Sequence, residues 1–330
     1  MMLARHAEDL YWAGRYLERA QDSARILDVT YHAAVTSPVG DDLRWARTLD
    51  VLLSAEDYRA RHEEVDGRDV MRMCILDRDA PSSIVRLLAD VRQNVHASRE
   101  LLSSELWEVV NDTWLALHRR DIARDTEQHP AGLLAWVKTQ CQAIVGVAVE
   151  TMPSDETLRF VFLGTQIERA MLTCRLVRCT GVPLLDAGAD LGEWLVLLRS
   201  CAGAEAYLRA GGAGRDTADV LRFLLFDPDF PRSLRHAIGS CGDHVTDLTG
   251  SPDGSRAARL LGRLHAQLQF GDLEEWLDSG LGGELDRLHT QLLQIDGAIA
   301  TRFFRQLEPL NLQSQTVPAG AHGPRGGDRP

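Results

Sequence analysis

A continuous apolar seam runs through the first predicted helix, from about Arg5 to Thr36, and constrains the fold more than any other feature. Along it, apolar and small residues recur at spacings of three and four, which is typical of a helix buried along one face. The seam consists of Leu10, Ala13, Leu17, Ala20, Ala24, Leu27, Tyr31 and Ala34. Because such a seam must be covered by other helices, the chain is expected to form a helical bundle.

The rest of the chain shows the same periodicity between glycine and proline breaks. Pro81-Ser82-Ser83 is predicted to start one long helix that reaches Val110. Ser154 is a candidate N-cap for a helix that runs to about Val177 and that Thr180-Gly181-Val182-Pro183 ends. Further helices are predicted at about 41–52, 131–150, 191–209, 216–226, 232–248, 255–269, 273–278 and 284–307. No segment alternates with period two over a useful length, so the predicted fold class is all-α, a bundle of long antiparallel helices with no sheet.

Two segments far apart in the chain resemble each other. Gly14 to Ala20 matches Gly164 to Ala170 at the glycine and at Glu-Arg-Ala, and Arg25 is matched by Arg175. The apolar seams of the two helices also have the same phase. We therefore predict an internal duplication, with pseudo-repeat halves of about 1–150 and 151–312 in one continuous helical domain, 1–312. Residues 313–330 are rich in glycine and proline and poor in apolar residues, so they are predicted to form a disordered tail.

Composition argues against several kinds of partner. The formal charge is −12, and no basic stripe with interleaved aromatic residues is present, so nucleic acid is not an expected partner. The N-terminus turns charged at once, unlike a signal peptide, and no apolar run approaches the length of a membrane span. The six cysteines are scattered without a Cys-x-x-Cys pair. These features predict a cytoplasmic protein with buried thiols and no membrane association.

Common catalytic signatures are missing as well. Lys138 is the only lysine, and no glycine-rich loop precedes it, which removes a phosphate-loop lysine from consideration. The sequence has no His-Glu-x-x-His, no Gly-x-Ser-x-Gly and no Glu-x-x-His on either Glu-Arg helix. We therefore predict no metal site and no cofactor. The residues favour a protein without enzymatic activity over an enzyme, and both alternatives stay open.

The Glu-Arg pair is the one polar feature that occurs twice in the same helical setting. In each copy the pair flanks the apolar seam, and an arginine follows two turns later on the same face. The candidate cluster consists of Glu18, Arg19, Arg25, Glu168, Arg169 and Arg175. Gly14 and Gly164, one turn before the glutamates, would let another backbone approach closely.

Two interpretations of this cluster stay open. In the structural one, Glu18 meets Arg169 and Glu168 meets Arg19 as reciprocal bidentate pairs that specify the register of the helices. In the functional one, the cluster binds an anionic group such as a carboxylate or a phosphate. Because structural ion-pair networks are common, the structural interpretation is preferred.

Two further groups are secondary candidates. The first lies on the predicted long helix and consists of Arg92, Asn94, Arg99, Glu105 and Asn111. Arg92 and Arg99, with Glu100, would be placed to contact the first helix, although a long helix also needs a solvated face. The second is Arg232, which follows a proline-fixed turn, with Ser233 as N-cap; a surface role is expected for Arg232.

The residues Leu10-Tyr11-Trp12-Ala13-Gly14-Arg15-Tyr16-Leu17-Glu18-Arg19-Ala20, with Leu163-Gly164 and Glu168-Arg169-Ala170, resemble the alpha-E family. The similarity continues through 103–111 and 223–233, so it covers the chain to about Leu310. The resemblance implies an α-helical domain found beside, and sometimes fused to, circularly permuted ATP-grasp proteins, often near transglutaminase-like proteins. ATP-grasp enzymes make amide bonds through acyl phosphates.

The resemblance favours a non-catalytic accessory subunit of an ATP-grasp amide-ligase system that forms peptides or tags them. The expected partners are then a circularly permuted ATP-grasp protein and a transglutaminase-like protein. The alternative is an enzyme or ligand-binding module that uses the duplicated Glu-Arg cluster to bind a carboxylate- or phosphate-bearing small molecule or peptide.

Overall fold

Every regular element in the computed structural model, which describes residues 2–36, 41–211 and 218–305, is a helix. The predicted all-α class is confirmed for these residues. Helix α1 (Ala4–Thr36) lies in the middle of the bundle and packs against α5 (Ile84–Ala97), α8 (Pro130–Thr151) and α9 (Glu156–Leu176). The seam predicted in the sequence is what these three helices cover, since Leu17, Ala20 and Leu27 are all buried.

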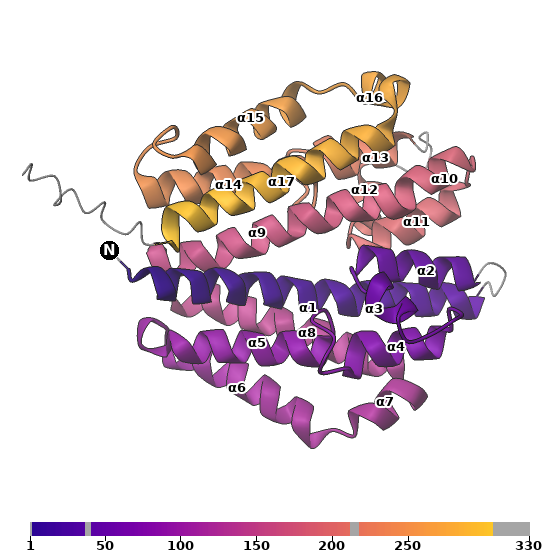
Figure 1. Ribbon diagram of the computed structural model, residues 1–330, viewed down its shortest axis with the longest axis horizontal. Helices are drawn as coiled ribbons and strands as arrows, with labels where there is room; N and C mark the ends of the chain where they lie inside the picture. Colours follow the sequence, from indigo (N-terminus) through magenta and orange to yellow (C-terminus); the bar gives the residue numbers. More distant parts are fainter. Residues whose placement is uncertain (1, 37–40, 212–217, 306–330) are drawn as a thin grey trace, which may run out of the picture.

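The second group of long helices surrounds α9 in a similar way. Helix α9 packs on α14 (Leu234–Thr249) and α17 (Leu281–Phe303), and α15 (Arg256–Phe270) covers both. Figure 1 shows α1 and α9 side by side across the molecule, with α5, α6 (Ser104–Arg119) and α8 on one side and α14, α15 and α17 on the other. The two central helices therefore lie between two outer groups.

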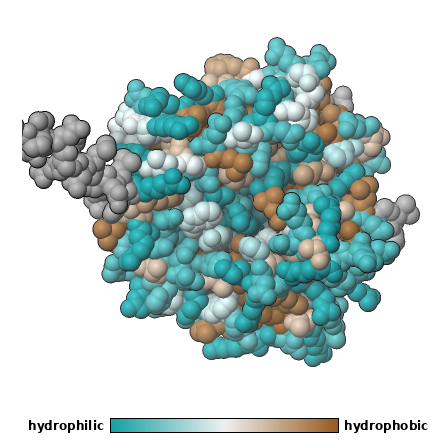
Figure 2. Space-filling view, in the orientation of Figure 1, coloured by the Kyte–Doolittle hydropathy of each residue, from teal (hydrophilic) through white to brown (hydrophobic). Residues whose placement is uncertain are grey.

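Short helices and one 3-10 turn complete the described part of the chain. They are α2 (Asp41–Val51), α3 (Ala55–Arg59), α4 (Gly67–Leu76), η1 (Arg99–Leu101), α7 (Ile122–Gln128), α10 (Val182–Asp186), α11 (Leu191–Ser200), α12 (Ala204–Arg209), α13 (Ala218–Phe226) and α16 (Leu273–Ser279). Seen from the side used in Figure 1, the surface is mostly hydrophilic, with hydrophobic residues in small separate groups (Figure 2).

Elements of the two halves follow one another in the same order. The order of α1 to α8 is matched by α9 and α11 to α17, whereas α10 and the turns at Arg99–Leu101 and Val177–Gly181 have no counterpart in the described part of the chain. The turns before α5 and α14 also correspond: the hydroxyl of Ser83 donates to the carbonyl of Asp77, and that of Ser233 donates to the carbonyl of Asp227. This order is what an internal duplication would produce, although the duplication itself stays a prediction.

A left-handed residue follows α2 and α11 alike. Leu53 has a φ of 56° and Ala202 a φ of 53°, and both are exposed. Such a conformation costs an L-residue roughly 1–2 kcal/mol, whereas glycine adopts it freely. We expect Ala202→Gly to raise the free energy of unfolding by up to about 1 kcal/mol, because the relieved strain exceeds the entropy that glycine adds to the unfolded chain. Urea denaturation would measure the change, and a destabilised variant would contradict the expectation.

Helices α1 and α9 approach each other most closely at two glycines. A Cβ atom built on Gly14 would lie 2.0 Å from the carbonyl oxygen of Val161, and one built on Gly164 would lie 2.0 Å from the carbonyl oxygen of Tyr11. The two contacts are reciprocal, as the two Glu-Arg motifs are. Only glycine permits this backbone separation.

The prediction of one long helix from Ile84 to Val110 is wrong, because this stretch forms two helices joined by a turn. Helix α5 ends at Ala97, a 3-10 turn follows, and α6 starts after Ser103, whose hydroxyl accepts from the backbone N–H of Leu106. The cap gives the new helix a defined start, and α6 folds back against α5. Likewise, the stretch 191–209 breaks at Cys201 into α11 and α12.

Two predicted helix limits also differ. The N-cap of α9 is Asp155, whose carboxylate accepts from Thr157 and Leu158, and not Ser154. The segment Thr180-Gly181-Val182-Pro183 does not end the helix, since a π-helical turn (Val177–Gly181) leads directly into α10. Pro183 lies in the first turn of α10, directly after the π-helical turn, and the helical backbone continues through it.

The expectation that no apolar run approaches the length of a membrane span is wrong for α8, the one helix in the described ranges that is long and apolar enough to cross a membrane, by length and composition only. A third (33%) of its apolar window is buried in the bundle. Cytoplasmic location therefore stays a prediction. The predicted tail, 313–330, and the end of the last predicted helix lie outside the described residues.

Candidate functional site

Two fully buried glutamates occupy the interface between α1 and α9. Glu18 accepts from Arg169 Nε and Nη2 at 2.8 and 3.0 Å, and Glu168 accepts from Arg19 Nε and Nη2 at 2.8 and 2.8 Å. The predicted reciprocal bidentate pairs are therefore confirmed. Glu18 is 2% exposed and Glu168 is 1% exposed, so both carboxylates depend on these arginines to replace water.

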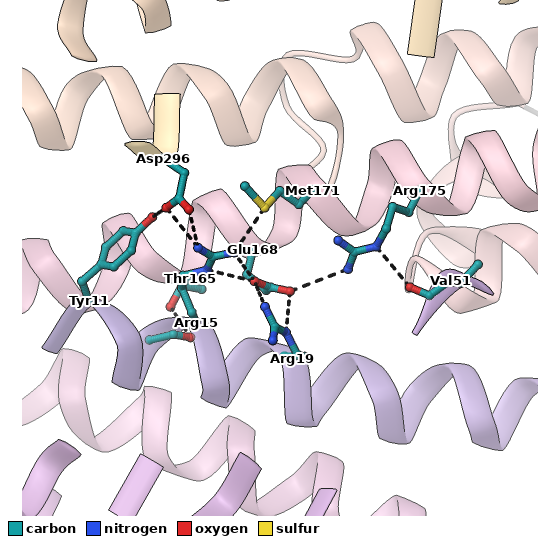
Figure 3. A network of polar contacts seen from close by, with 10 residues as sticks. Tyr11, Arg15, Arg19, Val51, Thr165, Glu168, Met171, Arg175 and Asp296 are labelled. Atoms are coloured by element: carbon teal, nitrogen blue, oxygen red, sulfur yellow. Dashed lines mark hydrogen bonds and ion pairs between the residues drawn. The ribbon is translucent and has the colours of Figure 1, made fainter. Parts of the chain in front are cut away.

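More charged groups surround Glu168 (Figure 3). Arg15 Nε donates to Glu168 Oε2 at 3.0 Å, and Arg15 Nη1 donates to both oxygens of Asp296 at 3.0 Å. The hydroxyl of Tyr11 donates to Asp296 at 2.5 Å. Arg175 reaches in from α9: its Nη2 lies 3.7 Å from Glu168 Oε1, and its Nε donates to the carbonyl of Val51 at 3.1 Å.

The surroundings of Glu18 include Arg232, for which a surface position was expected. That prediction is wrong: Arg232 is 8% exposed, with Nη2 2.7 Å from Glu18 Oε1 and Nη1 2.7 Å from Asp22 Oδ1. Arg25 also pairs with Asp22. The turn before α14 folds back onto the central helices, where the hydroxyl of Thr173 donates to the carbonyl of Arg232 at 2.9 Å and fixes its backbone.

These residues form two ion-pair clusters, one around Glu18 and one around Glu168, which together we call the Glu-Arg network. Its members are Tyr11, Arg15, Glu18, Arg19, Asp22, Arg25, Glu168, Arg169, Arg175, Arg232 and Asp296. The cluster predicted from the sequence is entirely contained in it. Arg15, Asp22, Tyr11 and Asp296 were not predicted.

For most of the residues that were not predicted, helical spacing in the sequence could have indicated their place in the network. Tyr11, Arg15 and Arg19 follow one another at intervals of four, and Asp22 lies four residues after Glu18, so all belong to adjacent ridges of α1. Asp296 had no such signal, because only the packing of α17 brings it to the network.

The secondary candidates on the predicted long helix lie elsewhere. Arg92 Nε donates to Asn111 Oδ1 at 2.9 Å and its guanidinium lies 5.5 Å from the ring centroid of Trp107, which joins α5 to α6. Arg99 and Glu105 are exposed, and Asn94 is half-buried. Of the contacts expected with the first helix, Glu100 makes one, with Oε1 3.5 Å from His6 Nε2. The structure does not bring this group into the Glu-Arg network.

The network also determines the charge states of its acids. Burial raises the pKa of Glu18, but the charges of Arg232 and Arg169 outweigh burial and lower it to about 2. Burial likewise raises the pKa of Glu168, and Arg19 and Arg15 lower it to about 2. Asp22 differs: burial, reinforced by Glu18, raises its pKa despite Arg232 and Arg25.

These pKa values predict an acid-sensitive core. A carboxylate whose pKa is lower in the folded than in the unfolded chain stabilises the fold above its unfolded pKa, and this stabilisation is lost as the pH falls through the folded pKa. For Glu18 and Glu168 the window runs from the ordinary value of 4.5 down to about 2. Asp22 has a raised pKa, so its protonation as the pH falls stabilises the fold and partly offsets the stability lost at the two glutamates. We expect urea denaturation to show the free energy of unfolding falling by a few kcal/mol across this window; constant stability would contradict it.

Within the described ranges, no group of three or more His, Cys, Asp or Glu side chains is placed to hold a metal ion. Lys138 Nζ pairs with Asp28 Oδ2 at 2.6 Å, away from the network. Of the cysteines, Cys179 is half-buried and the others are buried, and burial raises the pKa of thiols such as Cys141 and Cys241.

Comparison with known proteins places these residues in context. The sequence model of the Alpha-E family, described as a predicted alpha-helical domain with a conserved ER motif, matches residues 2–304. Uncharacterised proteins from Mycobacterium bovis and from two strains of Mycobacterium tuberculosis are 26% identical over 301 residues. The match covers 85% of this chain and 34% of each relative, so the chain spans about a third of the length of these curated relatives. No solved structure matches.

Proposed function

The chain belongs to the Alpha-E family, and we propose that it is a non-catalytic helical subunit that docks on an ATP-grasp amide ligase and helps to bind or present its substrate. The expected ligase is the circularly permuted ATP-grasp protein beside which alpha-E domains occur. A transglutaminase-like protein is the second expected partner. The system as a whole would form small peptides or attach them as tags.

The main observation in support is the length of the relatives. In each of them the region similar to this chain makes up 34% of the protein, so the helical domain is joined there to a longer stretch of other sequence. Interfaces between domains of one chain resemble those between separate proteins, so a contact made within the longer relatives could be made between separate chains. This favours a role beside a partner.

The chemistry of the Glu-Arg network gives a second argument. A general base works best when its pKa lies near the operating pH. Glu18 and Glu168 have pKa values of about 2, and both oxygens of each carboxylate accept from arginine, so neither is suited to take a proton at neutral pH. A network of this kind is better suited to hold a fixed arrangement of charges than to transfer protons.

The direct test mixes the purified chain with a purified circularly permuted ATP-grasp protein from the same genome. Analytical ultracentrifugation should show a complex of near-equal stoichiometry. ATP-dependent amide formation by the pair should be faster than by the ligase alone, with an unrelated acidic helical protein as the control. Independent sedimentation together with an unchanged ligation rate would contradict the proposal.

A further inference from the structure

The two halves of the Glu-Arg network differ at two corresponding positions. Beside Glu18, Asp22 on α1 and Arg232 in the turn before α14 fill the space with an ion pair. Beside Glu168, the residues at the corresponding positions are Leu172 on α9 and Ser82 in the turn before α5. A leucine and a serine cannot form that pair, and the serine is much shorter than an arginine. The space that Arg232 fills on one side is therefore left open on the other.

A cavity of about 200 Å³ lies there. Ligand sites for drug-sized molecules have volumes of about 300–1,000 Å³, so this cavity is suited to a smaller molecule. Its lining joins α1, the loop after α2, α3, the turn before α5, and α9. The polar residues of the lining are Arg19, Asp22, Ser23, Asp57, Ser82, Glu168 and Arg175.

Arg19 and Arg175 both line this space, and Arg175 has incomplete partners. Arg175 Nε donates to the carbonyl of Val51, but its nearest carboxylate oxygen is 3.7 Å away, too far for a hydrogen bond. Burial lowers the pKa of Arg175, and the charge of Glu168 does not fully offset it. Figure 3 shows the Arg175 side chain between Glu168 and Val51, with Arg19 below the same carboxylate. A ligand carboxylate beside both arginines would complete the hydrogen bonding of Arg175 and add a second anionic partner for Arg19.

Two acceptors of the lining also have no partner. Within the described residues, Asp22 Oδ2 and Ser23 Oγ make no hydrogen bond, although both residues are 1% exposed. Unpartnered polar atoms are costly in a buried position, so a ligand that donates to Asp22 Oδ2 would remove this cost. Arg19, Asp22 and Ser23 lie within one turn of α1, which puts an anion-binding group and an unpaired acceptor close together.

We propose that this cavity binds a small zwitterion of the α-amino-acid type. Arg19 and Arg175 hold its carboxylate, Asp22 Oδ2 accepts from its ammonium group, and Ser23 and Ser82 supply further hydrogen bonds. The unpaired acceptor Asp22 Oδ2 would repel a phosphate oxygen, whereas the ammonium group of a zwitterion would donate to it. The proposal does not depend on the docking of an ATP-grasp protein.

The test is isothermal titration calorimetry of the full chain with each of the common L-amino acids. Acetate, methylammonium and inorganic phosphate are the single-function probes. At least one amino acid is expected to bind at least about tenfold more tightly than any of these probes, because only a zwitterion engages both ends of the site. The proposal is overturned if no amino acid binds, or if acetate or phosphate binds as tightly.

Three variants locate the site. The double variant Leu172→Asp, Ser82→Arg copies the ion pair of the other half into the cavity and should abolish binding while the protein stays folded. Ser23→Ala removes a hydroxyl that has no partner in the protein, so it should leave stability unchanged and weaken binding several-fold. Arg175→Gln should weaken it by about 10- to 100-fold.

Arg178→Gln is the matched control. Arg178 lies close to Arg175 in sequence, but it pairs on the surface with Asp286 and does not line the cavity. This variant should bind as the original protein does. Amino-acid binding that persists in folded Leu172→Asp, Ser82→Arg protein would place the ligand elsewhere and overturn the assignment.

Discussion

Gly164→Ala is expected to destabilise the fold by more than about 4 kcal/mol, an exceptional effect for removing no side chain at all. The added Cβ would lie 2.0 Å from the carbonyl oxygen of Tyr11, whereas ordinary carbon–oxygen contacts begin at about 3.3 Å. The atom that the added Cβ would meet belongs to the backbone of α1, so the clash cannot be relieved by moving a flexible side chain. Helices α1 and α9 would have to separate, which would lengthen every ion pair of the Glu-Arg network that spans them.

Gly14→Ala should behave in the same way, since its Cβ would lie 2.0 Å from the carbonyl oxygen of Val161. Gly146→Ala is the matched control: Gly146 lies in α8 and has nothing within 4 Å of an added Cβ. There alanine should stabilise the helix by roughly 0.5–1 kcal/mol. Urea denaturation followed by circular dichroism measures all three variants. Similar stabilities for Gly164→Ala and Gly146→Ala would refute the close backbone contact.

Glu168→Ala is expected to cost about 3–5 kcal/mol, the range for removing one partner of a buried ion pair. The substitution removes the shared carboxylate of the buried Arg15 and the half-buried Arg19 and Arg175, and only Arg15 keeps another carboxylate partner, Asp296. The three guanidinium groups then repel one another without the charge that offsets them. The loss of packing volume contributes less than the loss of the charge.

Two comparisons separate charge from volume. Glu168→Gln keeps the volume and should recover only a minor part of the lost stability, because an amide oxygen accepts weakly from three cations. Glu127→Ala removes an exposed carboxylate 3.7 Å from Arg72 and should change stability by less than about 1 kcal/mol. If Glu168→Gln were as stable as the original protein, the network would not depend on the charge of Glu168.

Much of the centre of this protein was predictable from one sequence. The apolar seam predicted the burial of α1 from helical spacing alone. The repeated Glu-Arg motif predicted the two reciprocal pairs because its two copies were expected to pack around a pseudo-two-fold axis. What sequence spacing cannot give is contact between elements joined by long, irregular connections. Arg232 and Asp296 reach the network only through the packing of the turn before α14 and of α17.

Local capping explains the errors in helix limits. Apolar spacing continues through Ser98 to Ser103, so periodicity alone predicts one helix from Ile84 to Val110. The structure instead uses Ser103 as a cap and returns α6 along α5. At Val182-Pro183 the error is the opposite one: a proline that suggests a stop lies in the first turn of the next helix, where it is tolerated.

The crossing of α1 and α9 has a consequence for how the chain is made. Synthesis runs from the N-terminus, so α1 leaves the ribosome long before Arg169 is added. Until then Glu18 has no bidentate partner, and the row of charges on α1 must stay hydrated. Contacts between residues so distant in sequence form late and slow the folding reaction. The first half is therefore expected to stay incompletely packed until the second half has been translated. During that interval its apolar surface is exposed and can bind a chaperone that acts on nascent chains.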